Sequence, residues 1–521
     1  MSEYHRRPRG VSPHLVLART LMVWIAFFVR VSGLQAQGLW RDEVDQWRFA
    51  FEPLSDLVAN FTRPGWNGPL YSPLLRGWMG LTGDSVFAMR FSSTLWGILG
   101  VTLGYALAVR VSRPMARLWT GYREQAPHWV GLTTALLMAG SPYLVWYAQE
   151  IKMYTWVPML ALLALYCLAR ALSRADRALS RARAGLWVTV WGAVTMAFYS
   201  HILAALLVPV VVLWFLLHPS RIRRPWIAGL VTLSGLTLPY LPLLRWQTML
   251  IRIPRETGYP GYSLQQMVEV LLTRWSSGIW QGSWERPGPL LAIVILYGAL
   301  AGLGLTVLVA RRYIRTAGQL LAWLGVPLLA LWLVSLRGPI FTDRYLIWSA
   351  PAFYLLIAIG VIWLRCRLGR AVLLVVLPLL VIQGHGIVAQ TAYPIKPQFP
   401  EAVATVEAQR EARDLLLFQI PYNHYVFDFY SKDGLGAWHE APFTNWREPD
   451  GSFRVDGTYV AREMRGLVSG YDRVWLIYSE AALWDERELV KAWLDENYDR
   501  LETEELHGVT LFVYARRARQ R

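Results

Sequence analysis

The sequence predicts a polytopic all-α membrane protein with a small α/β domain at its C-terminal end. Of its 521 residues, 55% are hydrophobic and only 17% are charged, whereas soluble domains carry roughly 25% charged residues. Up to about residue 390, apolar runs of bilayer length alternate with short arginine-rich loops. The composition then becomes that of a soluble domain. We therefore expect a membrane part over 1–390 and an α/β domain over 391–521.

The membrane part contains eleven candidate transmembrane helices, because only a helix satisfies its own backbone hydrogen bonds inside lipid. A few are marginal against the roughly 17–25 residues that a span needs. Arginines precede the first run, as in a signal peptide, but its length and the spans that follow predict an uncleaved helix. The runs lie near residues 14–34, 88–110, 128–147, 154–172, 185–200, 202–218, 226–246, 288–309, 318–336, 345–363 and 371–388.

The loop charges predict the orientation of the chain. With the N-terminus in the cytoplasm, every inner loop is rich in arginine, as at 174–183 and 311–315, and the positive-inside rule is satisfied. We expect a multi-pass protein of the plasma or inner membrane whose C-terminal domain lies outside the cytoplasm. The net charge of +16 does not indicate a nucleic-acid partner, because the basic residues do not gather on one soluble module.

Two long outer loops and the C-terminal domain complete the predicted architecture. The loop over 35–87 is predicted to form short interfacial helices, and the loop over 247–287 an interfacial helix that ends in a mobile loop. In the C-terminal domain, "RDLLLFQI", "DRVWLIYS" and "GVTLFVYAR" read as strands, and "LWDERELVKAWLDENY" reads as a helix.

The cysteines and glycines exclude several kinds of site. Cys167 and Cys366 lie in or beside predicted spans, so neither a disulfide framework nor a Cys/His zinc site is indicated. The sequence holds no Gly-rich phosphate loop and no nucleotide fingerprint. A soluble nucleotide donor is therefore not indicated, and a lipid phosphate fits better.

The segment "GLWRDEVDQW" places Asp42 and Glu43 at the predicted outer edge of the bilayer. Two interpretations stay open on spacing alone. The charges can simply face water beside interfacial tryptophans. Alternatively, a carboxylate there can act as a general base on an acceptor hydroxyl, or help to bind a metal.

Two further polar stretches lie at the same predicted depth. In "SPYLVWYAQEIKMYTW", Glu150, Lys152 and Tyr154 follow an apolar run with no Gly and little turn chemistry, which favours a functional stretch over an ordinary turn. In "FYSHILAALL", His201 occupies a tight outer turn. It is either a buried core residue whose ring nitrogens are hydrogen-bonded, or part of a functional site.

Outer arginines run against the charge trend of the loops. Arg337 and Arg344 flank an outer turn, with Tyr345 beside it, and Arg90 lies at the outer start of the second span. Charge at the hydrocarbon edge is costly and is usually paired or functional. A guanidinium group suits a phosphate, although pairing with nearby acids or lipid headgroups explains these residues as well.

With these stretches in order, the sequence resembles the GT-C membrane glycosyltransferases. It is similar to bacterial relatives of the protein O-mannosyltransferases and of the aminoarabinose transferases that modify lipid A. The resemblance covers the whole membrane part. It depends on "LWRDE", "NGPLYSPLLRGWMGLTGDSVFAMRFSS", "SPYLVWYAQEIKMYTW", "YSHILAALL", "LPYLPLLRWQ" and "DRYLIWSAPAF".

The resemblance implies an inverting transfer of a hexosyl or pentosyl group from a polyprenyl phosphate to an acceptor hydroxyl or similar group, at the outer face. It implies that Asp42 is the base, with Glu43 as its acidic neighbour. Two motifs of the family are also matched. Glu150, Lys152 and Tyr154 match a Glu-x-Arg/Lys-x-Tyr stretch that lines the site, and Arg344 and Tyr345 match an Arg-Tyr pair that opens a late span.

The sequence departs from these relatives at "NGPLY". Many of them have His, or an acid and a base, where this chain has Asn67 and Gly68. Asn67 can donate and accept hydrogen bonds but is a poor metal ligand, which weakens a metal site or phosphate contact there. No cofactor is certain. A divalent metal near Asp42, Glu150 and His201 is an alternative.

The expected partners are a polyprenyl-phosphate sugar, an acceptor (protein, lipid or glycan) and membrane lipids. Lys152 and Arg344, with Arg90 or Arg337, would stabilise the charge that develops on the phosphate. A transporter or lipid flippase is the alternative function, although such proteins keep ionisable groups near mid-membrane. A non-catalytic scaffold that presents residues 391–521 is a third reading.

Overall fold

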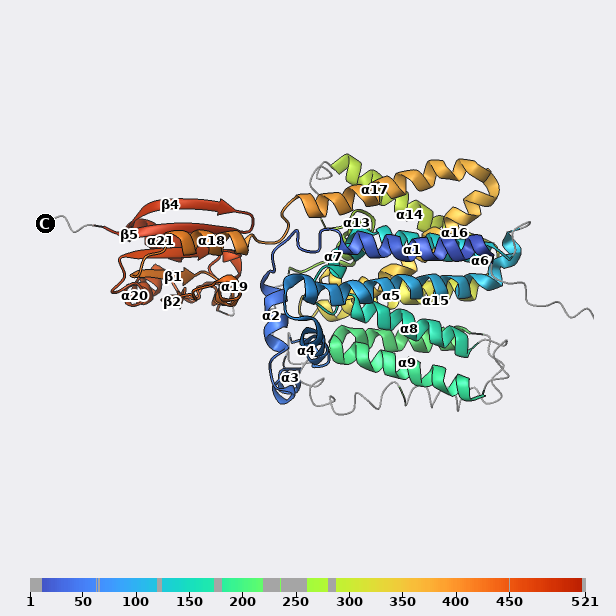
Figure 1. The fold of residues 1–521 in the computed structure, drawn as a ribbon, viewed down its shortest axis with the longest axis horizontal. Coiled ribbons are helices and arrows are strands. Elements are labelled where there is room, and N and C mark those ends of the chain that lie inside the picture. Colours follow the sequence, from blue (N-terminus) through green and yellow to red (C-terminus); the bar gives the residue numbers. More distant parts are fainter. Residues whose placement is uncertain are drawn as a thin grey trace, which may run out of the picture. The chain divides into compact units, whose positions relative to one another are not determined.

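A computed structural model describes residues 12–61, 63, 66–119, 124–172, 180–218, 235, 260–279, 287–448 and 450–517. The chain divides into two compact units (Figure 1). The helical unit comprises Met1–Leu34 and Phe49–Gln390. The C-terminal unit comprises Gln35–Arg48 and Thr391–Arg521, so it includes a short segment from the first predicted outer loop.

Long apolar helices dominate the helical unit. Within the described residues, five helical stretches are long and apolar enough to cross a membrane: Pro13–Val31, Val86–Leu118, Gly288–Ala310, Ile314–Ser335 and Asp343–Ala392. Shorter apolar helices lie at Trp156–Ala171, Ala184–Ser200 and Ile202–Leu217. Helices occupy ten of the eleven predicted spans, and the seventh, 226–246, lies outside the described residues except for residue 235. That each shorter helix crosses the membrane stays a prediction.

The described helices of this unit follow one another in chain order. They are α1 (Pro13–Val31), α3 (Leu54–Phe61), α4 (Tyr71–Thr82), α5 (Val86–Ser112), η1 (Arg113–Leu118), α6 (Ala126–Gly140), α7 (Pro142–Ala148), α8 (Trp156–Ala171), α9 (Ser180–Ser200), η3 (Ile202–Leu206), α10 (Leu207–Leu217), α13 (Leu264–Ser277), α14 (Pro287–Ala310), α15 (Ile314–Ser335), η6 (Asp343–Ser349), α16 (Ala350–Leu368), η7 (Gly369–Val372) and α17 (Leu373–Ala392). Short helices therefore occur in both predicted outer loops. Much of the second loop lies outside the described residues.

The third predicted span is broken in two at Ser141. The residue before a proline avoids the helical conformation, and Ser141, which precedes Pro142, is extended; its Oγ accepts from Leu144 N at 3.2 Å. The break leaves the last carbonyls of α6 without helical partners. The buried guanidinium of Arg30, from α1, donates to Ala139 O and Met138 O, each at 3.0 Å. Sequence reasoning had counted Arg30 as part of an apolar run.

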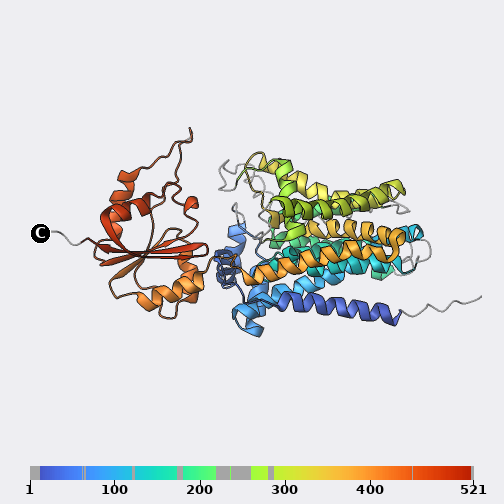
Figure 2. The ribbon, with the colours of Figure 1, turned by 90° about the horizontal axis from the view of Figure 1, so that it is seen from above.

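Helices α14 and α16 approach so closely that only glycine fits between them. A Cβ on Gly304 would lie 2.0 Å from Leu356 O, and one on Gly360 would lie 2.5 Å from Leu300 O. Small residues at such crossings allow helix backbones to touch and gain van der Waals contact in a membrane setting. Figure 2 shows the long helices of this unit running side by side.

The C-terminal unit contains a five-stranded mixed sheet with the order β2-β1-β3-β5-β4. Strand β1 (Asp414–Phe418) is parallel to β2 (Trp438–Glu440) and to β3 (Arg473–Tyr478). Strand β5 (Val509–Arg516) is antiparallel to β3 and to β4 (Tyr498–Leu506). The three predicted strands and the α/β class are confirmed. The charged edge strand β4, in which most side chains are exposed, was not predicted.

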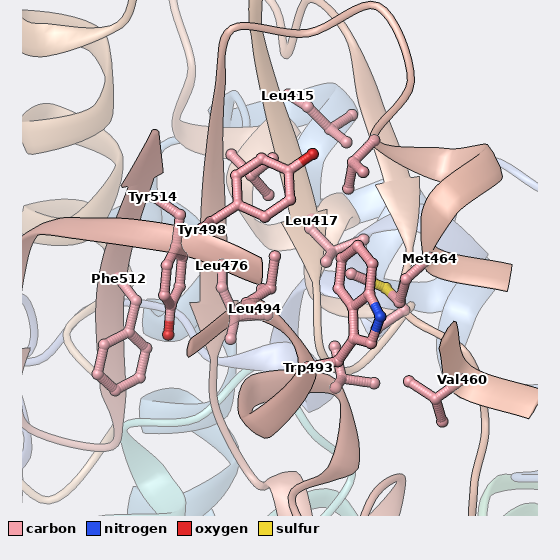
Figure 3. Packing of buried hydrophobic residues seen from close by; sticks show 14 residues of the cluster. Leu415, Leu417, Val460, Met464, Leu476, Trp493, Leu494, Tyr498, Phe512 and Tyr514 are labelled. Carbon is pink, nitrogen blue, oxygen red and sulfur yellow. The ribbon is translucent and has the colours of Figure 1, made fainter. Parts of the chain in front are cut away.

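Helices cover both faces of this sheet (Figure 2). On one face, Leu415, Leu417 and Leu476 pack with Val460, Met464, Trp493 and Leu494 (Figure 3). These last four belong to α20 (Gly457–Leu467) and α21 (Leu489–Asn497). On the other face, Phe418 packs against Phe427 of α19 (Asn423–Tyr430), and Phe427 packs against Phe399 of α18 (Phe399–Gln409). The predicted helix over 483–498 is confirmed for Leu489–Asn497, after the short η8 (Ala481–Leu483).

Candidate active site

Five of the predicted site residues meet in the helical unit. This group, the His201 cluster, consists of Lys152, Tyr154, His201, Arg344 and Tyr345. The His201 ring centre lies 4.9 Å from that of Tyr345 and 6.3 Å from that of Tyr154. The guanidinium carbon of Arg344 lies 5.6 Å from the centre of the Tyr154 ring. Three segments that are far apart in sequence thus form one cluster.

The cluster is cationic around a neutral imidazole. Burial, together with the positive charges of Arg344 and Lys152, lowers the pKa of His201 to about 3. His201 is therefore uncharged at neutral pH and offers one donor and one acceptor. Lys152 and Arg344 supply the positive charge of the cluster.

Tyrosines and acids surround these cations. Tyr147 lies within electrostatic range of the charged groups of Asp343, Glu150 and Arg344. The Tyr147 ring lies 5.3 Å from that of Tyr154, and the Tyr143 ring lies 5.1 Å from that of Tyr147. Helix α7, which exists because the third span is broken, supplies both of these tyrosines. Neither had been predicted as a site residue, since both looked like ordinary members of an apolar run.

The turn that carries Glu150 and Lys152 is held from several sides. Gln149 Nε2 donates to Arg30 O at 2.9 Å and to Ser32 O at 2.8 Å. Ser93 Oγ donates to Lys152 O at 3.5 Å. Glu150 is 1% exposed and Lys152 is 4% exposed. A fully buried turn with two charged side chains is expensive to build, which favours a functional role over a simple connection.

The "NGPLY" segment packs directly on the turn that holds His201. Gly68 N donates to Ser200 O at 3.1 Å, and Leu70 N donates to Tyr199 O at 3.0 Å. A Cβ on Gly68 would lie only 2.0 Å from Tyr199 O. Glycine is therefore required at this position. Asn67 lies next to it and is half-buried.

Two further arginines, Arg90 and Arg337, were predicted as site residues, and their contacts differ from those of Arg344. Arg90 is buried, and its Nη1 donates to Leu34 O at 2.9 Å, just beyond the end of α1. Arg337 is exposed, shortly after the end of α15. Their role at a phosphate stays a prediction.

Asp42 and Glu43 belong to the C-terminal unit. Both lie in the first turn of α2 (Arg41–Phe49), where the helix dipole favours carboxylates. Lys396 Nζ lies 2.7 Å from Glu43 Oε2, and both side chains are buried. Asp42 is half-buried. Arg41 pairs with Glu480, after the end of β3, at 3.1 Å.

Other contacts fasten residues 35–48 to the rest of the C-terminal unit. Gln37 Oε1 accepts from Ile395 N at 3.0 Å and from Lys396 N at 3.1 Å. The Leu39 amide donates to Tyr430 OH at 2.5 Å. The Arg48 guanidinium stacks on the ring of Tyr425. Helix α2 is thus built into this unit, and no local sequence pattern had indicated it.

The predicted metal alternative gains no support from side-chain clustering. Within the described part of the chain, no group of three or more His, Cys, Asp or Glu residues is arranged to hold a metal ion. A metal site stays a prediction, and no chemical step below depends on it.

An apolar groove of about 640 Å³ lies between α4 and α5. Its walls include Leu74, Trp78, Leu95, Trp96, Ile98 and Leu99. One part of the groove borders the turn of Lys152, because Tyr71 OH lies 3.3 Å from Ser93 Oγ, and Ser93 contacts Lys152 O. The rings of Trp96 and Trp156 meet at 4.7 Å. An apolar surface therefore leads toward buried polar groups.

No family model matches this sequence, and no curated protein matches it. Solved structures do share its fold. ArnT from Cupriavidus metallidurans in the apo state has a TM-score of 0.58 at 14% identity, covering 95% of this chain and 97% of that chain. ArnT bound to undecaprenyl phosphate has a TM-score of 0.54 at 16% identity, covering 95% and 97%. The oligosaccharyltransferase AglB from Archaeoglobus fulgidus, in complex with an inhibitory peptide and a dolichol-phosphate, has a TM-score of 0.54 at 12% identity, covering 98% and 75%.

These structural neighbours are GT-C glycosyltransferases. The fold expected from the sequence is therefore confirmed in kind: a mostly helical chain with several helices of membrane length and a small C-terminal sheet region. The number of spans and the orientation in the membrane stay predictions.

Proposed function

We propose that the protein is an integral-membrane glycosyltransferase that moves a sugar from a polyprenyl phosphate to an acceptor at the outer membrane face, with inversion. The observation that carries this proposal is the His201 cluster: two buried or half-buried cations, a neutral imidazole and two tyrosines. The neighbouring apolar groove supports a substrate that has both a charged head and a long apolar tail. A neighbour of the same fold was solved with undecaprenyl phosphate, a lipid of this kind.

In this proposal the donor phosphate binds Lys152 and Arg344, and the polyprenyl tail lies along the groove between α4 and α5. Charge-assisted hydrogen bonds from these cations suit phosphate oxygens. His201, being neutral, serves as a hydrogen-bond partner of the sugar or phosphate rather than as a proton source. In the same proposal, the Tyr154 and Tyr345 hydroxyls contact the sugar.

The reaction forms a bond between an acceptor oxygen and the anomeric carbon of the sugar, and breaks the bond from that carbon to the phosphate oxygen. The negative charge that develops on the leaving phosphate is stabilised by Lys152 and Arg344. The proton of the acceptor hydroxyl passes to Asp42. A carboxylate is too weak a base to ionise an alcohol beforehand, so proton transfer accompanies attack.

We assign Glu43 the role of a positioning residue for Asp42. Its carboxylate pairs with Lys396, and both side chains are buried, which fixes the first turn of α2. Asp42 shares that turn and is held in place by the neighbouring anchors Gln37 and Leu39. A preorganised base of this kind avoids reorganisation during the reaction.

The proposal is tested with purified full-length protein in lipid nanodiscs. A panel of polyprenyl-phosphate sugars, labelled in the sugar, is supplied with an envelope extract from cells that lack the gene. We expect transfer of label that disappears with Asp42→Asn and with the double change Lys152→Met and Arg344→Gln. Equal transfer from nucleotide sugars without any lipid carrier would contradict the donor assignment.

A further inference from the structure

Two adjoining pockets at one end of the helical unit are lined by arginine. The first, of about 660 Å³, lies among the ends of α5, α8 and α10 and the start of α15. The second, of about 380 Å³, lies beside it, next to α1, α5, α6 and α8. Arg110 and Arg113 line both, so the two pockets adjoin, and together they are called the basic site.

Among the residues described as lining this site, all the permanently charged side chains are positive. None of them is Asp or Glu, and two are histidines, His128 and His218. The concave, low-dielectric walls focus the field of the cations and attract an anion. The arginines of the two pockets are Arg19, Arg110, Arg113, Arg170, Arg312 and Arg315.

The larger pocket also has an apolar wall. Val111, Leu172, Trp214 and Leu217 line it beside the arginines. The indole of Trp214 is anchored, since its Nε1 donates to Gln319 O at 2.7 Å. A free inorganic anion would use only the basic side of this pocket. A phosphate that carries acyl chains would use both sides.

Arg312 holds its charge in an unfavourable backbone conformation. Its φ is +61°, in the left-handed region where an L side chain is strained. Here α14 ends in a Schellman motif: Tyr313 N donates to Leu308 O at 2.7 Å, and Arg312 N donates to Val309 O at 2.9 Å. Glycine is the usual residue at this position. Strain at a charged residue in a pocket is a mark of function.

The basic site is separate from the His201 cluster. On α5, Ser92 lines the groove and Ser93 contacts the Lys152 turn, whereas Arg110 lies near the other end of the helix and lines both basic pockets. From Ser93 to Arg110 this helix rises about 25 Å, at about 1.5 Å per residue. His201 likewise precedes η3 and α10, whereas His218 follows them. A ligand bound here does not take part in the proposed transfer.

We propose that this site binds an anionic phospholipid, with its phosphate on Arg110, Arg113 and Arg312 and an acyl chain along Trp214 and Leu217. Arginine forks bind phosphate oxygens in pairs, and basic pockets between membrane helices are suited to anionic headgroups. The proposal does not depend on the glycosyltransferase assignment.

The deciding variant is Arg312→Gly, which removes the charge while giving the left-handed position its preferred residue. The full-length protein is compared in nanodiscs of pure phosphatidylcholine and in nanodiscs containing phosphatidylglycerol or cardiolipin. Thermal unfolding reports stability, and native mass spectrometry reports retained lipid. We expect anionic lipid to raise the Tm of the wild type, and Arg312→Gly to reduce that rise by half or more. In phosphatidylcholine, the Tm of the variant should equal or exceed that of the wild type.

Two further variants complete the test. The double change Arg110→Gln and Arg113→Gln should abolish both the Tm rise and the retained lipid. The exposed Arg370, in η7, provides a matched control, and Arg370→Gln should leave the rise unchanged. The proposal is overturned if phosphatidylcholine and phosphatidylglycerol stabilise the wild type equally, or if Arg312→Gly keeps the full rise. Equal stabilisation by inorganic phosphate alone would overturn the lipid assignment and identify a small-anion site.

Discussion

The ammonium group of Lys396 lies 2.7 Å from the carboxylate of Glu43, although 353 residues separate the two in sequence. The side chains are 5% and 0% exposed. This pair joins the proposed catalytic segment to the start of the C-terminal domain. The role of that domain, which its sequence alone leaves open, therefore includes holding α2 in place.

Breaking this pair should destabilise the C-terminal unit. Lys396→Met leaves a buried carboxylate without its cation, which typically costs about 3–5 kcal/mol. The double change Lys396→Met and Glu43→Gln should recover much of that loss. Thermal unfolding of the full-length protein measures both. Arg413→Gln, which breaks an exposed pair with Asp472, is the control and should cost at most about 1 kcal/mol.

A positioning role for Glu43 also has a kinetic signature. Glu43→Gln should lower kcat while leaving the KM for the polyprenyl-phosphate sugar nearly unchanged, because the donor is held by Lys152 and Arg344. Glu43→Asp should restore part of the rate. An increase in KM with an unchanged kcat would instead place Glu43 at the donor.

Asp42→Asn should lower kcat by about 10²–10⁴-fold, the usual contribution of a general base, without changing the Tm. Asp45→Asn is the matched control. It lies in the same helix, and its side chain pairs with Arg48 at 3.5 Å near the surface. If both variants keep the wild-type rate in the labelled-sugar assay, Asp42 is not the base.

Lys152→Met and Arg344→Gln should each weaken phosphate stabilisation. The loss of one charge-assisted hydrogen bond, about 1.5–3 kcal/mol, corresponds to a decrease of about tenfold to a hundredfold in kcat/KM. Arg76→Gln, in α4, tests the specificity of this effect, because Arg76 is exposed. Similar losses in all three variants would point to a general effect of outer charge rather than to a phosphate site.

Because of His201, the free energy of unfolding of the protein should decrease as the pH is lowered. Its pKa is about 3 in the folded protein and near 6.5 when unfolded, so the unfolded chain binds the extra proton between these values. Stability should then fall as the pH is lowered through this window, by up to about 1.4 kcal/mol per pH unit. In thermal unfolding from pH 7 to pH 4, His201→Gln should give a flatter profile than the wild type. Parallel profiles would contradict a buried neutral imidazole.

Gly68→Ala should disrupt the site, because the new methyl group would lie 2.0 Å from Tyr199 O. Backbone atoms cannot move aside as a flexible side chain can, so we expect a loss of about 1–3 kcal/mol in stability and reduced transfer. Gly77→Ala, in α4, is the control, since nothing lies within 4 Å of its new methyl group. It should be neutral or stabilising in a Tm measurement.

Patterns that are local in the chain were readable from the sequence alone. The apolar runs predicted the long helices, because burial and backbone hydrogen bonding act within each segment. Short apolar runs predicted β1, β3 and β5. Residue chemistry selected Lys152, Tyr154, His201, Arg344 and Tyr345, and common depth in the membrane suggested that they belong together.

Only the tertiary structure decided which of these segments meet. The break at Ser141, the buried Arg30 and the close approach of Gly68 to Tyr199 depend on partners far away in the sequence. The same holds for the pair between Glu43 and Lys396, which assigns the Asp42 segment to the C-terminal unit. Ion pairs leave no periodic mark in a sequence, because any acid can meet any base. The packing of the folded chain determines which acid pairs with which base.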